Sequence, residues 1–202
     1  MKTIQEREHI YTIENFWSAQ HCEDYIAKAE NIGYEPATIL TANGPRLVDS
    51  VRNNSRVLYK DIALAGELWS TLESLAPKTI GNNVAIGLNE LFRFYKYQPG
   101  QQFRRHRDNS YIRNLYEVSF FTFMIYLNDN FTGGATVFED LIVKPKQGSA
   151  LIILPPLATR RRYSIGRNKI RSSYRYHVSL NTRIKIITQK DCAMETDLCI
   201  EL

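Results

Sequence analysis

The stretch that decides the fold is Phe94-Tyr-Lys-Tyr-Gln-Pro-Gly-Gln-Gln-Phe-Arg-Arg-His106-Arg-Asp108. A strand-like run ends in a Pro-Gly turn at Pro99 and Gly100 and is followed by His-x-Asp. In an extended chain, residues i and i+2 lie on one face, so the side chains of His106 and Asp108 would converge on one point. One histidine and one carboxylate are two thirds of the face that holds non-haem Fe(II). A bare His-x-Asp is also a common surface pair, so the rest of the chain has to decide between the two interpretations.

Length and composition indicate a globular protein. The 202 residues are 44% hydrophobic and 11% aromatic, which is enough for a core, and we treat residues 1–202 as a single domain. The sequence has no run of 18 apolar residues and its charged first residues do not resemble a signal peptide, which predicts no membrane partner. Three cysteines without metal-ligand spacing predict reduced thiols in a cytoplasmic protein.

The net charge of +5 is unevenly distributed. Residues 155–202 contain 10 Lys/Arg and 4 Asp/Glu, a net charge of +6, so residues 1–154 carry a net charge of −1. A basic tail of this kind can bind nucleic acid. A different origin of the tail, described below, makes nucleic acid the less favoured partner.

Hydrophobic periodicity changes from helical to strand-like along the chain. A supporting region, residues 10–87, contains two expected helices: 19–31, capped by Ser18, and 61–75, capped by Asp61. Residues 88–154 form the first part of the core. The expected strands are 10–16, 34–40, 88–97, 103–108, 118–127, 136–138, 141–143 and 149–154, with a loop at 41–50. The run 118–127 is apolar enough to be buried on both faces. This order predicts an α+β domain built on a β-sandwich or jelly roll.

Several spaced motifs resemble the prolyl 4-hydroxylase-like branch of the Fe(II)/2-oxoglutarate dioxygenases, over roughly residues 10–153. They are Arg93-Phe-Tyr-Lys-Tyr97-x-Pro-Gly-Gln-x-Phe-x-x-His106-x-Asp108, Thr122-Phe-Met-Ile-Tyr-Leu-Asn-Asp129, Gly133-Gly-Ala-Thr-Val-Phe138 and Val143-x-Pro-x-x-Gly148-x-Ala-Leu-Ile.

The resemblance implies a double-stranded β-helix, a cupin-like jelly roll, with N-terminal supporting helices and iron at one mouth. His106 and Asp108 would be the first two iron ligands. Tyr97 occupies the position whose phenol hydrogen-bonds the distal carboxylate of 2-oxoglutarate in the family; by spacing alone it could equally fill the core. The implied cofactors are Fe(II), 2-oxoglutarate and O2, with ascorbate, and the implied reaction is hydroxylation of a C–H bond.

The substrate is left open by the sequence. Arg52, Asn53 and Asn54 either line a substrate groove or supply turn chemistry, and the loop 109–114 is expected to shape the same groove. Peptidyl proline, another protein side chain and a small molecule all remain candidate substrates. Oligomeric state leaves no signal in the sequence.

The family pattern breaks after residue 154. The family has a second histidine about fifty residues after the aspartate, in His-Glu-Gly-x-x-Val-x-x-Gly-x-Lys-Tyr-x-Leu-Arg, where the histidine is the third ligand and a basic side chain pairs with 2-oxoglutarate. Here no histidine lies between Asp108 and His177. Thr159 stands at the histidine position and Ser173 at the arginine position, and neither hydroxyl replaces its counterpart.

Codon arithmetic offers an explanation. Shifting the reading frame by one base combines the last two bases of each codon with the first base of the next codon. With synonymous codons that the genetic code permits, the shifted frame encodes His-Glu-Gly at 159–161, Lys at 169 and Arg at 173. These residues come in the family order and without a gap. We infer that residues 155–202 are a divergent, out-of-frame segment and that its basic charge has the same origin. Resequencing the gene through codon 154 tests this hypothesis.

Substitutes for the missing groups are few. His177 is a candidate third ligand, against an ordinary strand histidine, and Lys169 and Arg171 are candidates for the 2-oxoglutarate carboxylate. The leading interpretation is a dioxygenase impaired by these losses. The alternative is a non-catalytic jelly-roll module that binds a peptide or an acidic ligand.

Overall fold

The computed structural model of the chain describes residues 1–76, 78–80, 83–106, 108, 111–154, 166–167, 170–172 and 175–186. At Ile80, at Phe120 and beyond residue 154 the description covers the backbone only. The candidate substitute Lys169 lies outside the described residues, as do Thr159 and Ser173 at the positions of the family histidine and arginine. In the described part, neither helix is both long and apolar enough to cross a membrane.

The two predicted helices are present. Helix α1 spans Ala19–Ile32, and the Ser18 hydroxyl accepts a hydrogen bond from the His21 N–H. Helix α2 spans Ile62–Leu72, ending three residues earlier than expected, and Asp61 Oδ1 accepts from Leu64 N at 2.9 Å. This bond, together with one from the Tyr59 hydroxyl, holds the pKa of Asp61 below its ordinary value. Short polar side chains thus start both helices, as the sequence indicates.

Strands make up most of the remaining structure. Their bounds are β1 Lys2–Arg7, β2 Ile10–Glu14, β3 Glu35–Pro36, β4 Ile39–Thr41, β5 Gly44–Arg46, β6 Ser55–Lys60, β7 Thr79–Ile80, β8 Asn83–Leu88, β9 Leu91–Tyr97, β10 Glu117–Tyr126, β11 Thr132–Gly133, β12 Thr136–Val137, β13 Ile142–Val143, β14 Ala150–Ile153, β15 Gly166–Arg167, β16 Ile170–Ser172 and β17 Arg175–Ile186. Two helices on a strand-rich body agree with the predicted α+β class.

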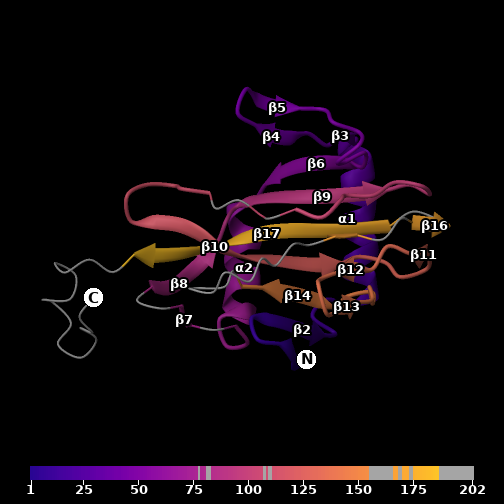
Figure 1. Cartoon of the computed structure of the whole chain (residues 1–202). Helices are drawn as coiled ribbons and strands as arrows, with labels where there is room; N and C mark the ends of the chain where they lie inside the picture. The colour runs from indigo at the N-terminus through magenta and orange to yellow at the C-terminus, as the bar shows by residue number, and fades with distance from the viewer. Residues whose placement is uncertain are drawn as a thin grey trace, which may run out of the picture.

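One large antiparallel sheet organises the molecule. Its order is β1-β2-β14-β10-β17-β9-β6-β3, with β8 pairing β17 and β7 pairing β8. Figure 1 shows the yellow-orange strand β17 running between β9 and β10, with the two helices behind the sheet. Smaller sheets, β13-β12-β15 and β11-β16, gather near one end of these strands. The backbone of the divergent segment therefore supplies a central strand.

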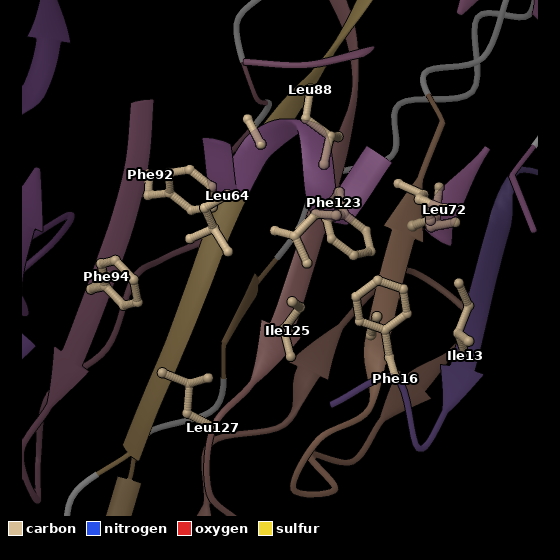
Figure 2. Close-up of a cluster of buried hydrophobic side chains, with 14 of the residues drawn as sticks. Ile13, Phe16, Leu64, Leu72, Leu88, Phe92, Phe94, Phe123, Ile125 and Leu127 are labelled. Atoms are coloured by element: carbon tan, nitrogen blue, oxygen red, sulfur yellow. The ribbon is translucent and has the colours of Figure 1, made fainter. Parts of the chain in front are cut away.

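The large sheet buries apolar side chains on both faces. On the helix side, residues of α1 and α2 pack against aromatic and aliphatic residues of β9, β10 and β14; Figure 2 shows part of this cluster, including Phe16, Leu64, Leu72, Phe92, Phe94, Phe123 and Ile125. A second apolar cluster joins β10 and β14 to the small sheet β13-β12-β15. It contains Ile10, Met124, Tyr126, Phe138, Val143, Leu151 and Ile153. Strand β10 contributes to both clusters, so the prediction that it is buried on both faces is confirmed.

Two local predictions were wrong. Residues 103–108 form isolated bridges at Phe103 and His106 in place of a regular strand, because the segment leaves the Pro-Gly turn along the irregular segment around Arg52. The expected loop 41–50 contains one arm of a hairpin, β4–β5, whose turn places Gly44 at φ 90°. The two turn residues are Ala42 and Asn43, and Gly44, the first residue of β5, takes up the positive φ that a glycine adopts without strain.

Gly148 holds the turn before β14 against the segment that precedes α1. Its φ is 73°, its carbonyl accepts from Trp17 N at 2.9 Å, and an added Cβ would overlap the Trp17 carbonyl oxygen. We expect Gly148→Ala to destabilise the protein by at least about 2 kcal/mol in urea unfolding. Gly66→Ala in α2 is the matched control: its added Cβ meets open space, and alanine should stabilise the helix by about 0.5–1 kcal/mol. Equal effects of the two substitutions would contradict this account of Gly148.

Candidate metal and co-substrate site

The His-x-Asp pair follows β9 and its tight turn. Gln101 N donates to Gln98 O at 3.0 Å, and Gly100 adopts φ 90°, which a glycine accepts without strain. The chain then returns alongside residues 51–53, where Arg104 N donates to Val51 O at 2.9 Å. This anchoring fixes the backbone from which the two candidate ligands project.

His106 and Asp108 bring two donor atoms together. His106 Nδ1 lies 2.8 Å from the carbonyl oxygen of Arg104, which can only accept, so Nδ1 carries the proton. His106 Nε2 lies 3.2 Å from Asp108 Oδ1. An imidazole lone pair and a carboxylate oxygen repel at this distance unless a positive centre, a proton or a metal cation, lies with them. A protonated imidazole in an ion pair and two ligands of one cation both fit this contact, so the assignment of His106 and Asp108 as metal ligands stays a prediction.

The carboxylate and the imidazole plane are each fixed by one neighbour. Thr122, in β10, donates from Oγ1 to Asp108 Oδ2 at 2.6 Å, which leaves Oδ1 turned toward His106. The Phe103 ring stacks on the imidazole with centroids 3.5 Å apart and planes inclined by 15°. Side chains held in this way would lose little freedom on binding a metal.

Tyr97 lies in the adjoining aromatic cluster. It is 1% exposed and shares the cluster with Tyr95, Phe103 and Phe131. Phe103 connects this cluster to His106, so the residue expected at the co-substrate lies close to the expected ligands. Its burial alone also fits a core aromatic, and its contact with 2-oxoglutarate stays a prediction.

Arg52, Asn53 and Asn54 lie beside the His-x-Asp segment. Arg52 forms a bridge with Phe103, and Asn53 Oδ1 accepts from Gln102 N at 2.8 Å. Asn54 is 2% exposed and accepts from Arg52 Nε at 2.8 Å. Asn53 thus bonds the backbone of a neighbouring segment, Asn54 holds the Arg52 guanidinium, and Arg52 reaches the aromatic cluster; a role of the three residues in a substrate groove stays a prediction.

The loop after the aspartate is described from Tyr111 onward. Ser119 N donates to Tyr111 O at 2.8 Å, and the Arg113 guanidinium pairs with Glu90. These contacts close a short hairpin, and Ile112 and Leu115 remain 74% and 85% exposed. The part of the loop closest in sequence to Asp108 lies outside the described residues.

The missing third ligand has no replacement among the described side chains. In that part of the chain, no group of three or more His, Cys, Asp or Glu side chains could hold a metal ion. Burial raises the pKa of the Cys22 thiol to about 11, so this core residue stays protonated at neutral pH. The backbone of His177 pairs with Tyr95 and Tyr126, and that of Arg171 lies in β16, which pairs with β11.

Sequence patterns alone did not identify three supporting groups: the Thr122 hydroxyl, the Arg104 carbonyl and the Phe103 ring. Each acts through a contact that depends on the tertiary fold or the local backbone path. Thr122 begins the family-like motif 122–129, but nothing in its spacing indicates a hydrogen bond to Asp108, fourteen positions earlier.

Comparisons with known proteins identify the region. Residues 92–178 match the model of the family "2OG-Fe(II) oxygenase superfamily". A comparison of the sequence with curated proteins gives no match.

Solved structures share the fold. A prolyl hydroxylase from Trichoplax adhaerens, in complex with a hypoxia inducible factor peptide fragment, is similar with a TM-score of 0.64 and 18% identity, covering 94% of this chain and 88% of its own. The viral collagen prolyl hydroxylase of Paramecium bursaria Chlorella virus-1 gives 0.60 and 16%, covering 87% and 96%. A Pseudomonas putida prolyl-4-hydroxylase gives 0.62 and 15%, covering 87% and 92%. The region that carries the His-x-Asp pair thus matches the model of the 2OG-Fe(II) oxygenase superfamily, and the chain shares its fold with prolyl hydroxylases.

Proposed function

We propose that the chain is an Fe(II)- and 2-oxoglutarate-dependent dioxygenase that hydroxylates a C–H bond of a protein side chain, prolyl or other, with reduced activity in this sequence. The observation that carries the proposal is the 3.2 Å approach of His106 Nε2 to Asp108 Oδ1 within the family-matching region. Peptide recognition by a structural neighbour supports a protein substrate. A small-molecule substrate is the alternative within the same chemistry.

The jelly roll is proposed to be a double-stranded β-helix. Two observations support this proposal. The large sheet contains the strand order β14-β10-β17-β9, and the second apolar cluster joins the β13-β12-β15 sheet to the large sheet. The His-x-Asp pair follows β9, so the iron would lie at the end of the barrel where that strand finishes. The same fold would place Tyr97 inside the barrel next to the co-substrate.

The described donors fit two coordination positions of Fe(II). A neutral imidazole nitrogen and a carboxylate oxygen are ligands that non-haem Fe(II) uses. His106 and Asp108 would hold the metal, and the Tyr97 phenol would hydrogen-bond the distal carboxylate of 2-oxoglutarate. When bound, Fe(II) with 2-oxoglutarate and O2 supplies the oxidising power for hydroxylation. His177 is a candidate substitute for the third ligand, and Arg171 and Lys169 are candidate substitutes for the carboxylate partner, but the proposal of reduced activity assumes that none of them restores the full set.

Reduced activity follows from the incomplete ligand set. Two protein ligands bind Fe(II) less tightly than three and orient the remaining positions less well. Ascorbate dependence and a cytoplasmic location belong to the same proposal, by resemblance and by cysteine usage. Succinate release from 2-oxoglutarate, with and without Fe(II) and ascorbate, tests the assignment in the full chain.

The non-catalytic binding module is the second candidate. It is supported by the absence of a third ligand among the described side chains. Such a module would bind a peptide or an acidic ligand without consuming 2-oxoglutarate. Ligand binding with no succinate release, even when the family frame is restored after residue 154, would favour the module over the enzyme.

Thr122 gives a test of the metal site that is independent of turnover. Thr122→Val removes the hydrogen bond to Asp108 Oδ2 and should weaken Mn(II) binding by about tenfold, measured by electron paramagnetic resonance. The control is Thr12→Val, which removes an equally short bond, from Thr12 in β2 to Glu6 in β1, that does not involve the His-x-Asp segment. If both variants bind Mn(II) like the unmodified chain, Thr122 does not position the carboxylate.

A further inference from the structure

Arg52 is a buried arginine next to the candidate metal site. The residue is 6% exposed. Its guanidinium carbon lies 4.5 Å from the centre of the Tyr95 ring and 4.2 Å from that of Phe103. Phe103 also stacks on His106, so a single aromatic ring connects the guanidinium to the imidazole. The location of Arg52 is therefore set by rigid aromatic neighbours on strand β9 and on the His-x-Asp segment.

Hydrogen bonding satisfies only part of the guanidinium. Nε donates to Asn54 Oδ1 at 2.8 Å, and Asn54 in turn donates to Ser55 O at 2.8 Å, which fixes the plane of the group. Nη2 is buried and has no hydrogen-bond partner among the residues that the structure describes. Among the described residues, the ion pairs of arginine side chains involve Arg7, Arg56 and Arg113, and no carboxylate pairs with Arg52.

A charged donor in this state is costly to the fold. An arginine in a protein is always protonated, and a buried unpaired N–H loses its water without gaining an acceptor. The aromatic faces attract the cation but cannot accept the in-plane hydrogen bonds of Nη2. An anion that approaches in the guanidinium plane would supply both the missing acceptor and the missing negative charge, and a carboxylate matches that fork geometry.

We propose that Arg52 binds a carboxylate through the Nη side of its guanidinium. Two ligands offer this chemistry: the distal carboxylate of 2-oxoglutarate, whose family arginine position is Ser173 here, and an acidic group on the substrate. The proposal rests on the proposed function for the identity of these ligands. Carboxylate binding at Arg52 does not itself require the metal, so the two can fail separately.

The test uses the full chain without metal and follows the Arg52 Nε–Hε resonance by 1H–15N NMR, assigned by its loss in Arg52→Lys. The probes are 2-oxoglutarate, acetate and, as the uncharged control, acetamide. We expect the carboxylates to shift this resonance and acetamide to leave it unchanged. The affinity for 2-oxoglutarate, measured by calorimetry, should fall by about tenfold or more in Arg52→Gln.

Arg46→Gln is the matched control, because it removes the same charge from an exposed position in the β4–β5 hairpin. A loss of 2-oxoglutarate affinity in Arg52→Gln alone assigns the carboxylate to the co-substrate. Unchanged 2-oxoglutarate affinity with an acetate-induced shift assigns it to the substrate. No shift with either carboxylate, or equal losses in both variants, overturns the proposal.

Two further measurements separate folding and metal effects. If thermal unfolding shows that Arg52→Gln does not fold, Arg52→Lys serves instead, because it keeps the charge but lacks the planar fork and should still weaken carboxylate binding. Mn(II) binding should be the same in Arg52→Gln or Arg52→Lys as in the unmodified chain. Absence of Mn(II) binding by the unmodified chain would contradict the proposed metal site while leaving the Arg52 result intact.

Discussion

His106→Ala is expected to lower the affinity of the chain for Mn(II) or Fe(II) by at least about 100-fold. Nε2 of His106 and Oδ1 of Asp108 are the two donor atoms that converge at 3.2 Å, and the substitution leaves only the carboxylate. Removal of the imidazole also takes away the stacking partner of Phe103, so a thermal unfolding curve must accompany the titration. Metal binding is measured by electron paramagnetic resonance of Mn(II), which does not depend on turnover.

Two other histidines serve as controls for His106. His21→Ala changes an exposed residue at the start of α1, hydrogen-bonded to Ser18, and should leave metal affinity unchanged. His177→Ala tests the proposed substitute ligand: a large loss would show that β17 supplies the third donor, and no loss would leave two protein ligands. Unchanged metal affinity in His106→Ala would contradict the site itself.

The second large effect is expected on restoring the family reading frame after residue 154. The restored chain would have histidine at position 159 and arginine at 173, completing the three-ligand face and the ion pair to 2-oxoglutarate. We expect 2-oxoglutarate-dependent succinate release to rise by at least about 100-fold over the present chain, since both losses act on co-substrate positioning. The measurement is succinate release per enzyme under saturating Fe(II).

The restored chain carrying His106→Ala is the control for this gain, because it has the new C-terminal segment but lacks a first ligand. It should release no succinate above background. Equal activity of the present and restored chains would show that the segment 155–202 already supplies what the reaction needs. An intact gene sequence with no single-base shift near codon 154 would refute the out-of-frame hypothesis on its own.

Local sequence patterns predicted the helices and strands that are determined by residues close together in the sequence. Ser18 and Asp61 cap the two helices because a short oxygen-bearing side chain satisfies the first free N–H groups wherever it precedes an apolar stripe. Strand β10 was predicted because it is apolar on both faces. The segment 103–108 was predicted wrongly because its path depends on pairing with residues 51–53, which are distant in sequence.

The sequence by itself determined the family-type His-x-Asp pair, the α+β class and the absence of a family histidine after Asp108, because these depend on residue identity and spacing. Only the tertiary structure decided how the pair is held. The Thr122 hydroxyl reaches Asp108 from a neighbouring strand, and the Arg104 carbonyl and Phe103 ring fix the imidazole. It also decided that Arg52 is buried against two rings, with one nitrogen that has no partner in the described part of the chain. Such contacts arise from chain segments that meet only when the sheet forms, so no spacing rule contains them.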